Sequence, residues 1–233
     1  MKITIDGPAG AGKSTIARML ANYLGFLYID TGAMYRTITY LALQQMLSFD
    51  DEKALHYLAA STKIEFNRNP DGTQEIYCNG LNVTEEIRAP IISQNVSKVA
   101  MYPSVREELV KMQRTMAESA DVVMDGRDAG TVILPDAECK IFLVASLEKR
   151  AYRRLLELQK KGYEQDYASI KEELAQRDYL DEHRSSSPLK PAQDAVIVDT
   201  TTMSPDEVMA EVLAIYQRKI AQKHTMGDKK DVL

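Results

Sequence analysis

The first fifteen residues hold the pattern with the clearest chemical meaning. The run from Lys2 to Thr15 reads KITIDGPAGAGKST. Its first residues alternate apolar and polar side chains as in a short strand, glycines follow, and helical spacing begins at Lys13. The pattern of Gly7, four residues, Gly12, Lys13 and Ser14 in this strand–loop–helix context is typical of a phosphate-binding P-loop.

In a P-loop, glycines allow backbone N–H groups to turn toward phosphate oxygens, and the helix N-terminus adds partial positive charge. We expect Lys13 to reach the β- and γ-phosphates and the Ser14 hydroxyl to bind the Mg²⁺ that bridges them. The alternative, a glycine-rich turn that binds nothing, is disfavoured by the complete pattern in its proper context. The residues expected to bind the nucleoside triphosphate are Gly7, Pro8, Ala9, Gly10, Ala11, Gly12, Lys13, Ser14 and Thr15.

Arginines suggest that a second anion binds nearby. Seven of them fall at predicted strand ends, in loops or on helices: Arg36, Arg106, Arg127, Arg153, Arg154, Arg177 and Arg184. A single arginine is most often a solvated residue on a helix face. Arg36 and Arg127, however, closely follow predicted strands, whose carboxyl ends are where open α/β sheets bind ligands. Phosphoryl transfer between two anionic nucleotides depends on positioning and charge neutralisation, for which guanidinium groups are suited.

Acidic residues also lie where they could take part. Asp125 follows the predicted strand at 122–124, where it could bind Mg²⁺, directly or through water, or simply cap the next turn. Asp181 has Arg177 four residues before it and Arg184 three residues after it. An ordinary ion pair on a helix surface is therefore an alternative to a substrate contact. The residues alone leave both alternatives open.

The elements that position these residues alternate between strands and helices. Apolar runs predict strands near residues 3–5 and at 26–29, 122–124, 140–144 and 195–199. Helical spacing predicts helices from Lys13 to residue 24 and over 33–46, 51–60, 91–100, 104–118, 147–161, 166–183 and 204–219. Residues 130–135 form either a short strand or a loop. This order predicts an α/β P-loop NTPase fold in which helices sandwich a central parallel sheet of about five strands.

One segment departs from this alternation. Between residues 63 and 84, apolar and polar residues alternate, and NPDG at 69–72 and NG at 79–80 are strong turn signals. We therefore expect a small antiparallel β insert at 63–89, between two parts of a core domain at 1–62 and 90–221. The core includes a helical lid region at about 150–190, and the polar residues 222–233 are expected to form a flexible tail.

Composition limits the classes of function. The 233 residues are 45% hydrophobic, enough for one large domain with an elaboration. The formal net charge of −5 gives no broad basic surface for nucleic acid. No apolar run approaches the roughly 20 residues that span a bilayer. The chain begins directly with a predicted strand, which leaves no room for a signal peptide. Its two cysteines do not suggest a disulfide scaffold. We expect a soluble, cytoplasmic monomer with no nucleic-acid or membrane partner.

Four segments resemble those of bacterial cytidylate (CMP) kinases, in the same order and at compatible spacings. They are ITIDGPAGAGKST at 3–15, DTGAMYR at 30–36, VMDGRDAGTVILPDAECKIFL at 123–143 and QRDYLDEHR at 176–184. The resemblance runs from Lys2 to about Lys219, and the insert is similar to the extended CMP-binding region of this family. It implies transfer of the γ-phosphoryl group of ATP to CMP or dCMP in pyrimidine nucleotide metabolism, with Mg²⁺ and with closure of mobile CMP-binding and lid segments.

The resemblance also implies roles for individual residues. Those that match the groups around the CMP phosphate are Thr31, Arg36, Arg127 and Arg184, and those that match the groups recognising cytosine are Ser97, Arg106 and Asp128. Arg177 and Asp181 match sugar contacts, and Arg153 and Arg154 fall in the lid helix. The residues expected to act in catalysis are Lys13, Arg127, Arg153 and Arg184. Ser14 stands where many relatives carry glycine, which leaves open whether it binds the metal itself.

Two other functions are compatible with a P-loop fold. A nucleotide-dependent switch would carry a guanine-recognition NKxD sequence or a DxxG pattern, and neither occurs in its usual place. Another small-molecule kinase, acting on UMP or shikimate, would differ mainly in its acceptor site. The sequence favours a CMP and dCMP kinase that uses ATP with Mg²⁺.

Overall fold

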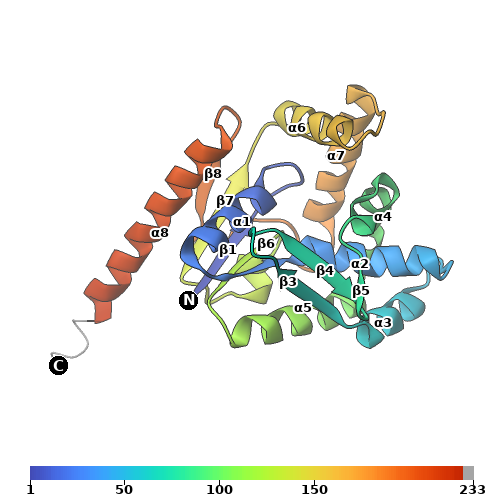
Figure 1. The fold of residues 1–233 in the computed structure, drawn as a ribbon, viewed down its shortest axis with the longest axis horizontal. Helices are drawn as coiled ribbons and strands as arrows, with labels where there is room; N and C mark the ends of the chain where they lie inside the picture. The colour runs from blue at the N-terminus through green and yellow to red at the C-terminus, as the bar shows by residue number, and fades with distance from the viewer. Residues whose placement is uncertain (228–233) are drawn as a thin grey trace.

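The computed structural model describes residues 1–227, with side chains described up to residue 222. Its centre is a five-stranded parallel sheet in the order β2-β6-β1-β7-β8 (Figure 1). The strands are β1 (Lys2–Asp6), β2 (Leu27–Asp30), β6 (Val122–Gly126), β7 (Cys139–Val144) and β8 (Val196–Asp199). The predicted parallel sheet of about five strands is confirmed. Because β1 pairs with both β6 and β7, the loop that follows it lies in the middle of the sheet's carboxyl edge.

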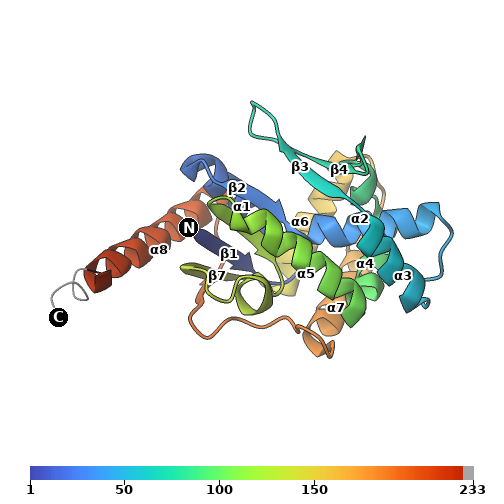
Figure 2. The same cartoon turned by 90° about the horizontal axis from the view of Figure 1, so that it is seen from below.

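Helices cover both faces of the sheet, as its apolar strands require. The three main ones are α1 (Lys13–Leu24), α5 (Pro103–Glu118) and α8 (Pro205–Gly227). On one face, Leu20 of α1 and Val212 of α8 are fully buried in one cluster with strand residues. On the other, Val110 of α5 packs in a cluster with Ile29 of β2. In Figure 2, α5 lies in front of the sheet. No helix in the described part of the chain is long and apolar enough to cross a bilayer.

A second core lies beside the sheet and carries the insert. Its helices are α2 (Thr31–Gln44), α3 (Glu52–Ser61), η1 (Glu86–Arg88) and α4 (Pro90–Ala100), and the insert forms β3 (Ile64–Arg68), β4 (Gln74–Cys78) and β5 (Leu81–Asn82). The three insert strands make an antiparallel sheet, as predicted. Ile64 and Ile76 are buried in one cluster with Ile38 of α2 and Leu55 of α3. The insert therefore shares its core with the helices around it.

Two further helices, α6 (Leu147–Lys160) and α7 (Tyr167–His183), pack against each other in the region predicted as the lid. Figure 1 shows the pair at the P-loop end of the sheet. Leu158 of α6 and Ile170 of α7 belong to a small apolar cluster that also contains Ala9 of the P-loop. The helix pair thus packs directly on the phosphate-binding loop.

The most informative differences from the sequence-based prediction concern α2, residues 129–133 and α8. α2 begins at Thr31 instead of residue 33, because the Asp30 side chain caps it by accepting a 2.8 Å hydrogen bond from Ala33 N. Residues Ala129–Ile133 form a π-helical turn, η2, where a strand or loop was expected. α8 extends to Gly227, beyond the predicted end at residue 219. The tail predicted at 222–233 thus begins within a helix, and residues 228–233 lie outside the described part of the chain.

The second core allows a direct test of packing. Leu55 of α3 is fully buried in it, whereas Tyr57 on the same helix is 74% exposed. Replacing Leu55 by alanine should lower the free energy of unfolding by about 2–5 kcal/mol, because apolar burial is lost and a cavity is left. The control Tyr57→Ala should change it by less than about 0.5 kcal/mol. Urea unfolding measures both, and equal effects would contradict this description of the core.

Candidate active site

The P-loop at the end of β1 is shaped by its glycines. Gly10 and Gly12 adopt φ angles of 76° and 93°, in the left-handed region that glycine favours. A Cβ on Gly7 would lie 2.1 Å from the carbonyl oxygen of Leu143 in β7, so a larger residue would not fit. The N-terminus of α1 follows at Lys13. This is the strand–loop–helix arrangement that phosphate binding uses.

Lys13 is buried against the loop that it serves. Its Nζ donates a hydrogen bond to the carbonyl oxygen of Pro8 at 2.8 Å. Burial, and next the positive charge of Arg127, lower the pKa of Lys13 from 10.5 to about 7. A phosphate beside the amine would favour its charged form. Lys13 is therefore placed to interact with a bound anion.

Asp125 lies at the carboxyl end of β6, where both of its carboxylate oxygens are held. Oδ2 accepts a hydrogen bond from Ser14 Oγ at 2.9 Å, and Oδ1 accepts one from Tyr28 Oη at 2.7 Å. Burial, with the nearby Asp30 carboxylate, raises the pKa of Asp125 to about 7.

This oxygen-rich position suits a magnesium ion. Hydroxyl and carboxylate oxygens are ligands that Mg²⁺ prefers, and the ion usually takes its other ligands from water and substrate phosphates. Among the described residues, no group of three or more His, Cys, Asp or Glu side chains could hold a metal by itself. Ser14 and Asp125 therefore fit a Mg²⁺ that is held mainly by bound phosphates.

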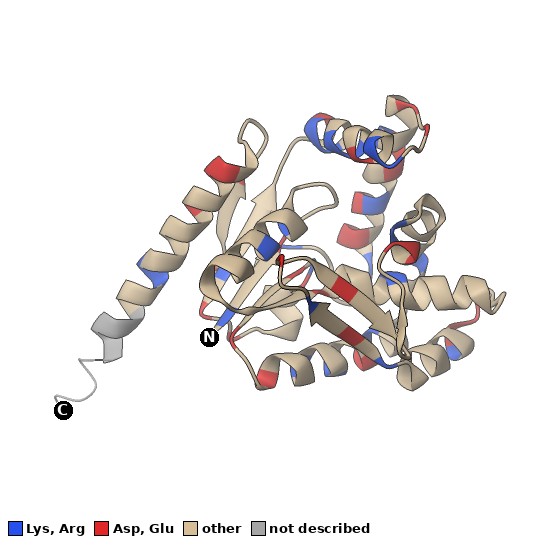
Figure 3. Ribbon diagram, viewed as in Figure 1, with Lys and Arg blue, Asp and Glu red and all other residues tan. Residues whose placement is uncertain are grey.

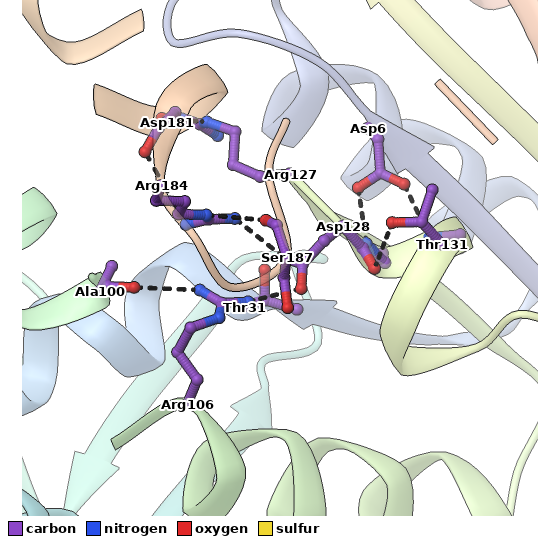
Figure 4. Close-up of polar contacts among 12 residues, drawn as sticks. Asp6, Thr31, Ala100, Arg106, Arg127, Asp128, Thr131, Asp181, Arg184 and Ser187 are labelled. Carbon is purple, nitrogen blue, oxygen red and sulfur yellow. Dashed lines mark hydrogen bonds and ion pairs between the residues drawn. The ribbon is translucent and has the colours of Figure 1, made fainter. Parts of the chain in front are cut away.

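A largely buried chain of opposite charges lies at the same edge of the sheet (Figure 4). Arg127 Nε donates to Asp181 Oδ2 at 2.8 Å, and Arg184 Nη1 lies 3.9 Å from Asp181 Oδ1. Arg184 Nη2 lies 3.6 Å from Asp128 Oδ1, and Arg106 Nη2 donates to Asp128 Oδ2 at 2.5 Å. Three guanidinium groups thus share two carboxylates, and positive charge is in excess.

Three more of the predicted acceptor residues lie near this chain of charges. Thr31 Oγ1 donates to the backbone carbonyl of Asp125 at 2.7 Å, and Arg36 Nη2 pairs with Asp30 Oδ2 at 2.9 Å. Arg177 is half-buried, and its enclosed Nε is unpaired among the described residues. Burial and a neighbouring arginine lower its pKa to about 10. An anion would stabilise such clustered guanidinium groups.

The two predicted lid arginines make other contacts. Arg153 Nη2 donates to the carbonyl oxygen of Thr200 at 2.6 Å, and its Nη1 donates to the hydroxyl of the same residue at 3.1 Å. Arg154 pairs with Glu157 at 2.9 Å. Ser97, predicted to contact the base, is half-buried on α4. The structure therefore does not bring Arg153 into the chain of charges.

Three residues at this edge of the sheet were not predicted from the sequence. Arg150 of α6 donates to the carbonyl oxygen of Ala9 at 3.1 Å and pairs with Asp178 of α7 at 2.6 Å. Tyr28 donates a hydrogen bond to the carboxylate of Asp125. Asp6 accepts two backbone hydrogen bonds from η2, at 2.9 and 2.7 Å. Arg150 could have been suspected from the sequence because it lies in a basic helix. Tyr28 and Asp6 could not, because their hydrogen bonds are made with distant segments of the chain.

The fold and the site together define a P-loop kinase. A solved gluconokinase from Sinorhizobium meliloti 1021 shares the fold, with a TM-score of 0.50 and 15% identity, over 97% of this chain and 96% of that chain. The chain belongs to the cytidylate kinase family, whose model matches residues 3–218. It is 51% identical to the cytidylate kinase of Lactobacillus gasseri, over 94% of this chain and 95% of that protein. Identity to the cytidylate kinase of Bacillus licheniformis is also 51%, over 95% and 97%. The resemblance found in the sequence is confirmed.

The buried carboxyl group of Asp6 leads to a prediction about pH. Burial raises its pKa from 3.8 to about 6. The unfolded chain therefore ionises this group first as pH rises, and ionisation destabilises the fold until the penalty is complete above about pH 6. An Asp6→Asn variant lacks the penalty. The free energy of unfolding of the wild type, relative to the variant, should fall by about 2–3 kcal/mol from pH 4 to 7. Urea unfolding at several pH values tests this, and a constant difference would contradict it.

Proposed function

We propose that the chain transfers the γ-phosphoryl group of ATP to CMP and dCMP, giving CDP and dCDP, in pyrimidine nucleotide metabolism. The observation that carries this proposal is that the P-loop and the chain of charges that includes Arg127 follow the carboxyl ends of two paired strands, where Asp6 of β1 lies opposite Gly126 of β6. The charge of Arg127 acts on Lys13, so a donor phosphate and an acceptor phosphate can lie close together. Similarity to cytidylate kinases supports the choice of acceptor.

On the donor side, the loop from Gly7 to Thr15 binds the phosphates of ATP. Its backbone N–H groups and the N-terminus of α1 favour negative charge. Lys13 stabilises the charge on the γ-phosphoryl group as it is transferred. Ser14 and Asp125 would hold Mg²⁺, which when bound neutralises the phosphate oxygens.

On the acceptor side, different residues are proposed to bind the phosphate, the sugar and the base of CMP. The residues proposed to bind the CMP phosphate are Thr31, Arg36, Arg127 and Arg184, and those proposed to contact the sugar and the base are Arg177, Asp181, Ser97, Arg106 and Asp128. Guanidinium groups offset the repulsion between two anionic nucleotides and orient the acceptor phosphate in line. We also propose that closure of the lid at about 150–190 frees Arg153 from Thr200 and brings it, with Arg154, toward the phosphates.

The enzyme is further proposed to act as a cytoplasmic monomer without nucleic-acid or membrane partners. The negative net charge of the chain supports the absence of a nucleic-acid partner. Sedimentation of the purified protein tests the oligomeric state, and a stable dimer would contradict it.

A coupled assay of ADP formation tests the reaction itself. The acceptors compared are CMP, dCMP, UMP, AMP, GMP and shikimate, each with ATP and Mg²⁺. Rapid ADP formation with CMP and dCMP supports the proposal. Preference for UMP or shikimate would assign a different small-molecule kinase, and ATP hydrolysis that no acceptor stimulates would favour a nucleotide-dependent switch.

Removing the P-loop amine should impair the chemical step. Replacing Lys13 by methionine keeps much of the side-chain length but removes the charge that acts on the γ-phosphoryl group. We expect transition-state stabilisation to fall by about 3 kcal/mol or more, a loss of over about a hundredfold in kcat/KM. The control Lys53→Met lies on the exposed surface of α3 and should behave as wild type. Near-normal turnover of the Lys13 variant would remove the lysine from the mechanism.

The insert at 63–89 is proposed to bind CMP and to respond to it. Its hairpin contacts the core through Asn22 Nδ2, which donates to the carbonyl oxygen of Gly72 at 3.2 Å, and through Gln74 Nε2, which donates to that of Tyr28 at 2.7 Å. Bound CMP should slow hydrogen exchange across residues 63–100, since ordering protects backbone amides. Exchange in α8 should stay unchanged. Identical exchange at 63–100 with and without CMP would contradict this role.

Base choice should depend on Asp128. Cytosine carries an amino donor at ring position 4, where uracil carries a carbonyl acceptor, and an ionised carboxylate can only accept. Mismatched polar groups at this position and at ring position 3 predict a preference for CMP over UMP of about a hundredfold or more in kcat/KM. Asp128→Asn supplies an amide that can also donate a hydrogen bond, so the preference for CMP over UMP should become smaller. Equal loss on both nucleotides would show that Asp128 does not recognise the base.

A further inference from the structure

Asp6, the last residue of β1, is a buried carboxylate to which the proposed reaction assigns no role. It is 5% exposed and directly precedes the P-loop. Its Oδ1 accepts a hydrogen bond from Ala129 N at 2.9 Å, and its Oδ2 accepts one from Gly130 N at 2.7 Å (Figure 4). Two backbone donors thus offset the desolvation of a buried carboxylate. A side chain on the central strand fixes the start of η2, which lies 123 residues later in the chain.

The residue held by this contact is Asp128, which immediately precedes the two bonded N–H groups. Its carboxylate lies between Arg106 and Arg184, on the proposed base side of the acceptor site. At the other end of the same segment, Thr31 Oγ1 donates to the carbonyl oxygen of Asp125. The short segment that carries Asp128 is therefore anchored at both ends by buried side chains.

The anchor at η2 is also tightly packed. A Cβ on Gly130 would lie 2.7 Å from Thr4 Oγ1 and 3.3 Å from Asp6 Oδ2. The first distance is shorter than side chains normally approach, so an alanine at this position must displace η2 or its neighbours. Gly130→Ala thus disturbs the contact between β1 and η2 by adding a methyl group. Asp6→Asn disturbs the same contact by removing a hydrogen-bond acceptor.

We propose that Asp6 is a positioning residue for base selection, because it holds the backbone that aims Asp128 at the 4-amino group of cytosine. This inference rests on the proposed role of Asp128 in the CMP kinase reaction. An asparagine at position 6 keeps one acceptor oxygen but sets an NH₂ group against the second backbone donor. One end of the segment is then released while the P-loop sequence stays intact.

The test compares kcat/KM for CMP and for UMP in the wild type, Asp6→Asn, Gly130→Ala and Asp128→Asn. The ratio of the two values should fall about tenfold in both the Asp6 and the Gly130 variants, since one ordering contact is lost or displaced. The KM for ATP should stay within about threefold of the wild-type value. A matched control is Asp51→Asn, because Asp51 also accepts a backbone hydrogen bond, from Ala54 N at 3.0 Å, but caps α3 on the surface. The ratio of kcat/KM for CMP to that for UMP in the Asp51→Asn variant should equal the wild-type ratio.

The outcomes separate this inference from the proposed function. One outcome is that Asp128→Asn lowers the ratio of kcat/KM for CMP to that for UMP, while Asp6→Asn and Gly130→Ala keep the wild-type ratio. In that case the positioning role of Asp6 is overturned and base recognition by Asp128 stands. Equal losses on CMP and UMP in the Asp6 and Gly130 variants overturn it as well. If Asp128→Asn itself leaves the ratio unchanged, base recognition fails and this inference fails with it. If the Asp6→Asn variant does not fold, the ratio measured for Gly130→Ala decides whether the positioning role stands.

Discussion

Five charged side chains, three arginines and two aspartates, are largely withdrawn from water beside the P-loop, and each depends on its neighbours for a partner. Burying such groups costs several kcal/mol per ion, and apolar residues of similar volume often stabilise a protein as well or better. Stability alone therefore does not explain why, within the described part of the chain, the ion pairs of Arg106, Arg127 and Arg184 involve just the carboxylates of Asp128 and Asp181. The excess positive charge is explained if the site completes its pairing with an anion, which a nucleoside monophosphate supplies. Figure 3 shows acidic and basic residues interspersed over the rest of the fold.

The same excess charge extends to the donor side. Arg127 lowers the pKa of Lys13, whereas the carboxylate of Asp125 raises it. Repulsion between the two cations falls when an anion binds near either of them. By linkage, any effect that an anion bound beside one of these cations has on anion binding beside the other must be reciprocal. The proposed donor and acceptor sites therefore influence each other electrostatically through Lys13 and Arg127.

Local patterns in the sequence were sufficient for the parts of the fold that local patterns determine. The P-loop, the five parallel strands and the antiparallel insert each followed from spacing, turn residues and apolar alternation. The π-helical turn after Asp128 did not, because it is stabilised by Asp6, a residue of a distant strand. The family resemblance supplied the acceptor residues that are proposed here. It did not show that Arg150 contacts the P-loop while Arg153 contacts Thr200, since both lie one helical turn apart in the same basic helix.

Arg150 also connects the helices of the predicted lid region to the P-loop. Its guanidinium joins the P-loop, through the carbonyl oxygen of Ala9, to α7, through Asp178. α7 also carries Arg177 and Asp181, which are proposed to contact the acceptor. Ala9 packs in the same apolar cluster as α6 and α7, so the contact is supported by burial as well as by charge. A displacement of α7 must therefore either break a buried ion pair or move the P-loop with it. Because breaking such a pair leaves an uncompensated charge, the second course is favoured, and the contact would link the proposed acceptor site to the proposed donor site.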